Sequence, residues 1–146
     1  MRVFIFQSQI WLPKRREEVF PFFADAANLE KLTPPLLHFE ILTPQPIPLQ
    51  AGTLIDYRLR VHGVPMKWKT RISVWEPPFR FVDEQLRGPY RQWIHEHRFE
   101  EENGGTLCVD TVRYAVWGGA LVNALVVKRD VAKIFTYRNT RLTEIF

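Results

Sequence analysis

The sequence predicts an α+β fold with an antiparallel sheet of about seven strands and one long C-terminal helix. Two observations lead to this prediction. Residues 3–116 are divided by Gly and Pro turns into short stretches with alternating apolar residues, which is typical of strands. After Gly118 and Gly119, no Gly or Pro follows, and apolar residues recur at helical spacing. A single amphipathic helix must bury its apolar face, so we expect it to pack on the sheet.

The N-terminal part contains one strand and two short helices. The strand covers residues 3–12 and ends at Pro13. A short helix is predicted over residues 14–23, where Pro21 is compatible only with a first turn or a kink. A second short helix over residues 29–32 stops before Pro34. Residues 36–42 are predicted to form the second strand, and three prolines between residues 44 and 48 indicate an extended connector.

The remaining strands are separated by turn sequences, of which Asn103-Gly104-Gly105 is the strongest hairpin signal. A four-residue turn is expected over His62–Pro65. The predicted strands cover residues 52–61, 66–74, 79–86, 91–100 and 106–116. The residues expected on the buried face of the final helix are Leu121, Leu125, Ala132, Phe135, Leu142 and Phe146.

The composition predicts one globular domain over residues 1–146, because the chain is long enough for one core but not for two. Cys108 is the only cysteine, which favours a reducing, cytoplasmic location. The N-terminus has too short an apolar run for a signal peptide. The most apolar tract, residues 115–127, is shorter than the about 20 residues that span a bilayer, so no transmembrane segment is expected.

Four segments carry a resemblance to a known family: residues 28–35, residues 81–85, residues 88–97 and residues 134–138. Together with the order of elements, they resemble the START-like, or SRPBCC, helix-grip superfamily. The resemblance covers the whole chain and is strongest to its bacterial single-domain ligand-binding branch, which is related to polyketide cyclase/dehydrase-like proteins. It implies that the sheet is curved and wraps around the C-terminal helix, with a deep, mostly apolar cavity between them for hydrophobic or amphipathic small molecules. It does not decide the chemistry, because this fold hosts binders, transporters and enzymes.

The sixth strand is the most informative segment for function. Period two places Trp93, His95 and His97 on one face, and an Asn-Gly turn centre would put His97 opposite Asp110 and Trp93 opposite Tyr114. These groups could be polar wall groups that satisfy one another, or groups that orient a ligand. They could also be acid-base groups, with Asp110 orienting His97 and raising its basicity. His95, His97 and Asp110 are therefore the catalytic candidates.

Aromatic residues with polar tips suit an amphipathic guest. Arg138, in the last helix, could pair with an acidic ligand group or lie on the surface. The residues predicted to bind a ligand are Tyr57, Trp68, Trp93, His95, His97, Asp110, Tyr114 and Phe135.

Two other sites are considered and set aside. His95 and His97 point the same way, but a metal site needs at least a third ligand, and hairpin pairing supplies only Asp110. No metal is therefore predicted. Cys108 is expected to be a small apolar filler rather than a nucleophile. No nucleotide-binding fingerprint is present, so no cofactor is expected.

A basic stripe on the outer sheet face raises a different function. Arg58 and Arg60 are predicted to face Lys69 and Lys67, and like charges in such pairs are mildly destabilising. An anionic partner could offset them, but neighbouring glutamates or solvent could do the same. The net charge of +4 is modest, and nucleic acid is an unlikely partner because stacking aromatics are not evident there.

The sequence thus predicts a binder of a hydrophobic or amphipathic small molecule, with transport or sequestration as its role. A cyclase or dehydratase-type enzyme using the cavity histidines is the first alternative. An interaction module using the basic face is the second. The protein is expected to be a monomer or a homodimer.

Overall fold

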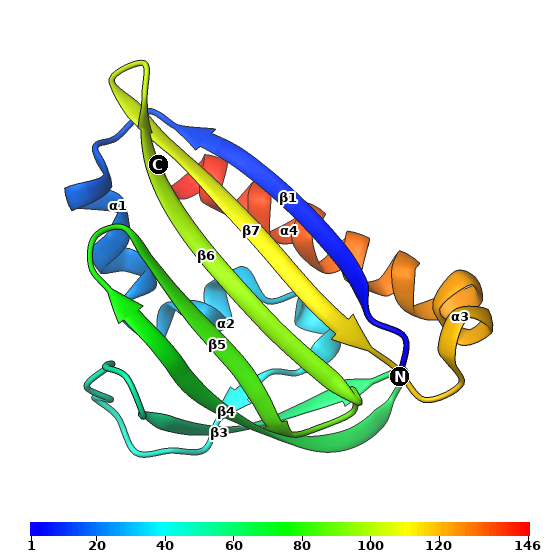
Figure 1. Ribbon diagram of the computed structural model, residues 1–146. Coiled ribbons are helices and arrows are strands. Elements are labelled where there is room, and N and C mark those ends of the chain that lie inside the picture. Colours follow the sequence, from blue (N-terminus) through cyan, green and yellow to red (C-terminus); the bar gives the residue numbers. More distant parts are fainter.

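A computed structural model describes residues 1–146, and it contains one seven-stranded sheet in which every neighbouring pair is antiparallel. The strand order is β1-β7-β6-β5-β4-β3-β2. Figure 1 shows the sheet curving strongly from β1 round to β3. The strands are β1 (Phe4–Leu12), β2 (Glu40–Ile41), β3 (Leu54–Val61), β4 (Val64–Glu76), β5 (Arg80–Arg87), β6 (Gln92–Glu102) and β7 (Gly105–Ala115).

The helices cover the concave side of the sheet. The long helix runs behind β1 and β7, and the two short helices lie near its C-terminal half (Figure 1). The predicted α+β architecture is confirmed. The helical elements are α1 (Arg16–Phe23), α2 (Asn28–Leu32), the 3-10 helix η1 (Pro35–Leu37), α3 (Gly119–Val122), the π-helical turn η2 (Asn123–Val127) and α4 (Lys128–Ile145).

The second strand is much shorter than predicted. Residues 35–37 form η1, and His38 caps it in the left-handed region with a φ of 47°. Proline at the first position of a helical turn is favourable because its fixed φ suits that turn. Only Glu40 and Ile41 then pair with β3, so the predicted strand over residues 36–42 is wrong for most of its length.

The β3–β4 hairpin is tighter than expected. Its loop consists of His62 and Gly63, whose φ values of 49° and 78° are those of a two-residue turn that matches strand twist. The predicted register therefore shifts, and Arg58 faces Lys67. Lys69 faces Asp56 instead of an arginine, so the expected run of opposed like charges is wrong.

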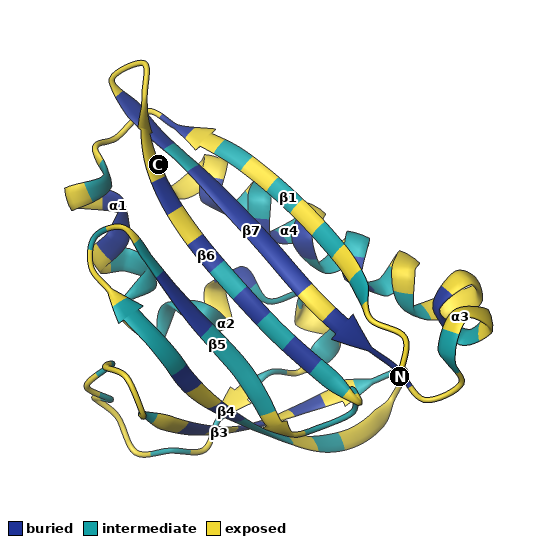
Figure 2. Ribbon diagram, viewed as in Figure 1, coloured by how far each residue is buried: buried dark blue, intermediate teal, exposed yellow.

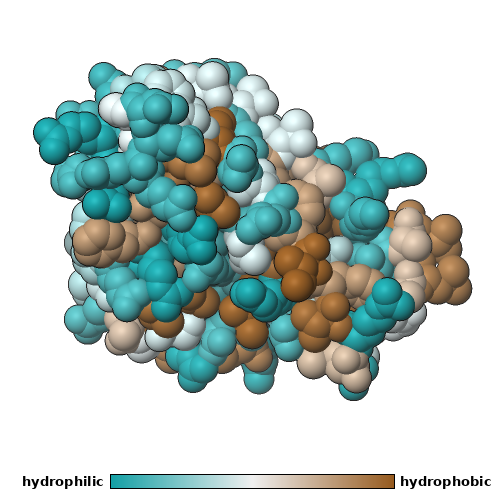
Figure 3. Space-filling model, turned by 45° about the horizontal axis from the view of Figure 1, so that its top comes forward, coloured by the Kyte–Doolittle hydropathy of each residue, from teal (hydrophilic) through white to brown (hydrophobic).

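The C-terminal helix buries a different face from the one predicted for its first turns. Leu121 and Leu125 are 69% and 67% exposed, although both were expected to be buried. The turn η2 inserts one extra residue and rotates everything before it relative to α4. Brown apolar residues therefore gather on the surface at the end of the molecule where α3 lies (Figure 3). The buried residues of α4 are Val131, Phe135, Arg138 and Leu142.

The core lies between the concave sheet face and α1, α2 and α4. Figure 2 shows β7 buried along most of its length, because β1 and β6 flank it and α4 covers it. One apolar cluster packs α1 and the end of α4 against the sheet around Phe20, Phe99 and Leu142. A second cluster packs the middle of α4 against Trp93 and Tyr114. Polar residues occupy the region between the two clusters.

Candidate functional site

Strand β6 carries the two histidines of the site. Its residues alternate between buried and more exposed positions, so His95 and His97 both point into the core. The predicted hairpin register is confirmed: His97 pairs with Asp110, and Trp93 pairs with Tyr114. Both histidines are 6% exposed.

Each histidine bonds to a different carboxylate. His95 Nε2 lies 2.8 Å from Asp110 Oδ1, and His97 Nε2 lies 2.6 Å from Asp83 Oδ2. The expectation that Asp110 would orient His97 is therefore wrong, because the shorter contact of Asp110 is to His95. Asp83, on β5 opposite His95, was missed by the sequence reasoning.

Arg138 of α4 completes the cluster from the opposite side. Its guanidinium is buried, with Nη2 3.3 Å from His97 Nδ1 and 3.6 Å from Asp110 Oδ1. A guanidinium can only donate, so His97 Nδ1 accepts and its proton resides on Nε2, which donates to Asp83. Arg138 is thus a buried structural partner rather than a surface residue.

The cluster shifts the pKa of its members. Burial raises the pKa of the Asp110 carboxyl, but the charge of Arg138 and the hydrogen bond from His95 outweigh it and hold that pKa well below its usual range. Burial also raises the pKa of Asp83, and the His97 hydrogen bond and nearby positive charge bring it below its usual value. Burial, followed by the proximity of His95, lowers the pKa of His97 to about 4. The buried Asp110 carboxylate, the half-buried Asp83 carboxylate and one guanidinium therefore share this space at neutral pH.

The rings of the cluster are held by stacking. The centroids of His95 and His97 lie 3.6 Å apart, and Phe81 stacks on the other face of His97 at 4.0 Å. Phe135 meets His95 edge-on at 5.4 Å. Aromatic contacts of this kind fix ring orientation, so both imidazoles present their nitrogens in set directions.

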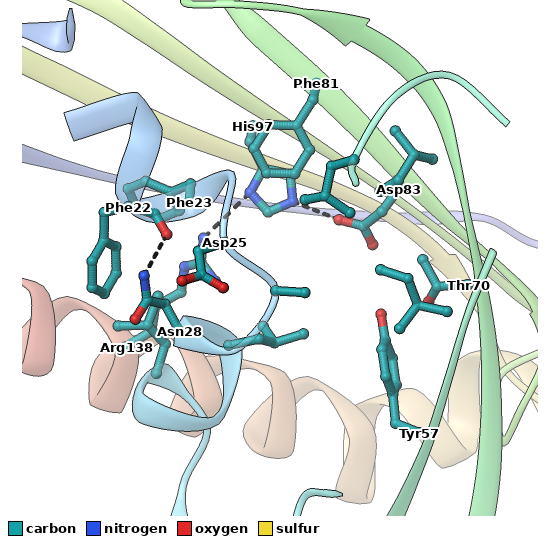
Figure 4. A pocket seen from close by; sticks show the side chains of 16 residues that line it. Phe22, Phe23, Asp25, Asn28, Tyr57, Thr70, Phe81, Asp83, His97 and Arg138 are labelled. Atoms are coloured by element: carbon teal, nitrogen blue, oxygen red, sulfur yellow. Dashed lines mark hydrogen bonds and ion pairs between the residues drawn. The ribbon is translucent and has the colours of Figure 1, made fainter. Parts of the chain in front are cut away.

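A small cavity adjoins this cluster between the sheet, α1, α2 and α4 (Figure 4). Its volume is about 60 Å³, and 10 of its 16 lining residues are hydrophobic. Of the polar cluster, His97, Asp83 and Arg138 reach its wall. The full lining comprises Phe22, Phe23, Asp25, Ala26, Asn28, Leu29, Leu32, Leu49, Ile55, Tyr57, Thr70, Ile72, Phe81, Asp83, His97 and Arg138.

The cavity wall also carries two hydroxyl groups. Thr70 is 1% exposed, and its Oγ1 has the Tyr57 hydroxyl as a neighbour but makes no hydrogen bond of good geometry. Tyr57 extends from β3 toward it, with its hydroxyl directed into the interior (Figure 4). Burial, assisted by the charge of Asp83, raises the pKa of the Tyr57 phenol, so it stays protonated and able to donate. A buried hydroxyl without a partner costs free energy, which a bound polar group could recover.

Four of the predicted aromatic residues lie elsewhere. Trp68 and Trp93 pack edge-on at 5.6 Å, and Tyr114 donates to Asn123 Oδ1 at 2.6 Å. These residues and Phe135 fill the second apolar cluster or pack against it, and none lines the cavity. His95 and Asp110 also lie behind the wall. Of the eight predicted binding residues, the cavity surface includes Tyr57 and His97.

Neither the thiol nor the basic stripe forms a second site. Cys108 is buried in the first apolar cluster, and burial raises its pKa to about 12. On the outer face, Arg58 pairs with Glu40 and Arg71 with Glu84. Arg80 bonds to two further glutamates. Arg80 lies outside the predicted stripe, and Arg60, Lys67 and Lys69 form no ion pair, so neighbouring acids neutralise Arg58 and Arg71 alone.

Solved structures share this fold at low sequence identity. The major latex-like protein 151 from Panax ginseng superposes with a TM-score of 0.70 at 9% identity over 97% of this chain and 96% of its own. Protein TTHA0849 from Thermus thermophilus gives 0.66 at 21% identity over 94% and 96%. A nucleoside-diphosphate sugar epimerase from Corynebacterium glutamicum gives 0.66 at 24% identity, over 95% of this chain but 28% of that longer chain.

The fold and its cavity thus define a helix-grip protein. The family model described as polyketide cyclase / dehydrase and lipid transport matches residues 12–134, and the chain belongs to this family. No curated protein matches the sequence. None of the helices combines the length and apolarity needed to cross a bilayer.

Proposed function

We propose that the protein binds a small amphipathic molecule in the cavity between the sheet, α2 and α4, in a role of transport or sequestration. The observation that carries the proposal is the pair of buried hydroxyls, Thr70 and Tyr57, which lie side by side in an otherwise mostly apolar wall without a hydrogen bond of good geometry between them. The Tyr57 phenol is protonated, and beside this pair lies the neutral His97 ring with its hydrogen bond to the Asp83 carboxylate. A guest with a hydroxyl or carbonyl group would satisfy these groups, and its apolar part would contact Leu29, Leu49 and Ile55.

The geometry favours binding over acid-base catalysis of the cyclase or dehydratase type. A general base needs a free lone pair directed at its substrate. His97 is the one histidine at the cavity surface, and both of its nitrogens are engaged, Nε2 with Asp83 and Nδ1 with Arg138. An interaction module remains the second candidate, because Arg60, Lys67 and Lys69 of the basic stripe form no ion pair, although Arg58 pairs with Glu40. The membership in a family described by lipid transport agrees with a carrier, and we place it in the cytoplasm because of the single cysteine.

Native mass spectrometry of the purified protein, with organic extraction of what co-purifies, tests this proposal. A bound amphipathic molecule at defined stoichiometry is the expected result. The extracted compound, or a fluorescent fatty-acid or steroid probe if none is found, is then titrated into wild type and Thr70→Val. Protein that is empty and takes up no probe would overturn the proposal, as would a guest bound equally by both forms.

A further inference from the structure

In the polar cluster, His95 and Asp83 lie close together but are not hydrogen-bonded to each other. His95 Nε2 donates to Asp110, so in the neutral ring Nδ1 carries the lone pair. That Nδ1 lies 3.9 Å from Asp83 Oδ2 and is not hydrogen-bonded to it. A nitrogen lone pair and a carboxylate oxygen therefore lie close together in a buried site, and a cation between them would turn repulsion into attraction.

His97 supplies a third potential ligand atom beside His95 Nδ1 and Asp83 Oδ2. His97 Nε2 is 2.6 Å from the same Asp83 oxygen, and the ligand atoms of Asp83, His95 and His97 all lie within 4.8 Å of one another. Two imidazoles and one carboxylate are a ligand set that divalent first-row transition metals accept, with further positions left open. We propose that Asp83, His95 and His97 bind one divalent transition-metal ion of the Zn²⁺, Co²⁺ or Fe²⁺ type. Asp83 supplies the ligand that hairpin pairing alone could not find.

Asp110 supports this assignment from the far side of both rings. Its Oδ1 lies 2.8 Å from His95 Nε2 and 3.4 Å from His97 Nδ1. Histidines that bind metals through one nitrogen usually donate the other N–H to a carboxylate or carbonyl, which orients the ring. Here one carboxylate oxygen can serve both histidines while their remaining nitrogens converge on Asp83.

Metal binding requires two local changes. The proton of His97 moves from Nε2 to Nδ1, where it can donate to Asp110, and Arg138 turns away from Nδ1 while keeping Asp110. The contact between His97 and Asp83 lengthens from 2.6 Å, and that between His95 and Asp83 shortens from 3.9 Å, to about 3.4 Å, the separation of two ligands at about 2.1 Å from one tetrahedral ion. The proton of His97 moves between the two nitrogens of its own ring and is not lost to solvent.

The cavity leaves room for the open positions of the ion. Asp83 and His97 both line it, and its volume of about 60 Å³ holds about four water molecules at roughly 15 Å³ each. Two carboxylates and Arg138 carry a net charge of −1, which a divalent ion would change to +1. Water, hydroxide or an anionic group could complete the coordination. The site does not rest on the proposed guest, because the ion binds protein groups alone.

Titration of EDTA-treated, dialysed protein with Zn²⁺ by calorimetry, and with Co²⁺ by visible absorption, tests the site. The expected result is one equivalent per chain and a Co²⁺ spectrum with nitrogen and oxygen ligands. His95→Gln and His97→Gln should abolish uptake, and Asp110→Asn should weaken it about 10- to 100-fold. His62→Gln is the matched control, because His62 forms an exposed pair with Asp130 at 2.7 Å, and it should change nothing.

Wild-type protein provides a readout that does not depend on the variants folding. Long-range ¹H–¹⁵N spectra of the histidine rings should show Zn²⁺ shifting His95 Nδ1 and His97 Nε2. No stoichiometric uptake at about 1 mM free Zn²⁺ would overturn the proposal. Zn²⁺ uptake that is retained in His95→Gln and His97→Gln would also overturn the proposal. Loss of uptake in His62→Gln would place the bound ion at His62 instead. Metal binding without guest uptake would support the metal site and contradict the proposed function. Guest uptake without metal binding would support the proposed function and contradict the metal site.

Discussion

Asp83 and Asp110 contact the same pair of stacked imidazoles, those of His95 and His97, from opposite sides. Asp83 comes from β5 and contacts His97 at 2.6 Å, and Asp110 comes from β7 and contacts His95 at 2.8 Å. Since β6 lies between those two strands, the histidines form the centre of a polar layer that crosses the sheet. Arg138 is the cation that makes the buried Asp110 carboxylate in this layer tolerable.

Arg138→Met should destabilise the protein by about 3 kcal/mol or more, because it leaves Asp110 buried without its main compensating charge. The free energy of unfolding from urea denaturation measures this. Arg141→Met is the matched control one turn along α4, since Arg141 pairs with the exposed Glu144, and it should cost less than about 1 kcal/mol. Equal losses in the two variants would contradict the assigned role of Arg138.

Thr70→Val should raise the stability of the empty protein by about 1 kcal/mol and weaken guest binding. The substitution keeps the shape and removes a buried hydroxyl whose contact with the Tyr57 hydroxyl is not a hydrogen bond of good geometry. Thr106→Val is the matched control, because the equally buried Thr106 hydroxyl donates to Lys14 O at 2.7 Å, away from the cavity. It should destabilise the protein and leave binding unchanged. Thermal unfolding with and without guest measures both effects, and a destabilised Thr70→Val would count against an unpaired hydroxyl.

Tyr57 should make the protein less stable in alkali. Its pKa is raised in the folded state, first by burial and then by the charge of Asp83, so the unfolded chain loses this proton first, near pH 10. Stability is fully present below that pH and falls as the pH rises above it. Unfolding free energies measured on both sides of this pH should show a shallower decline in Tyr57→Phe. Identical declines would show that Tyr57 does not carry the effect.

Cys108 should react with thiol reagents only after the protein opens. Burial raises its pKa to about 12, and its side chain packs in the first apolar cluster, so little accessible thiolate exists near neutral pH. Labelling with a chromogenic disulfide should be slow in buffer and fast in denaturant. Rapid labelling of the folded protein would contradict the closed packing around Cys108.

The part of the site formed by one hairpin was predictable. Asn103 and Gly104 form the expected two-residue turn, and counting outward from it places His97 opposite Asp110. Asp83 could not be placed the same way, since the β4–β5 pairing contains register shifts and the β5–β6 connection is longer. The one sequence signal for Asp83 was its spacing of two residues from the apolar Phe81, which places both side chains on the same face of β5.

The long helix shows a different limit. Arg138 follows Phe135 by three residues and precedes Leu142 by four, so it lies on the buried stripe. A charged residue is normally expected at the surface. Arg138 is buried because it forms an ion pair with Asp110 on β7. Leu121 and Leu125 were assigned to this stripe because periodicity assumes a continuous α-helix, which the π turn interrupts.

The cavity volume sets a threshold on what can enter. Pockets for drug-sized molecules are roughly 300–1,000 Å³, whereas this one is about 60 Å³. Anything larger than a few heavy atoms must push aside Leu29 of α2 or Leu49 of the proline-rich connector, both of which line the wall. The apparent affinity for such a molecule is then its intrinsic affinity multiplied by the fraction of chains already open. Substitutions in the connector at residues other than Leu49, which themselves do not line the cavity, would therefore change the affinity for every large guest by the same factor without contacting it.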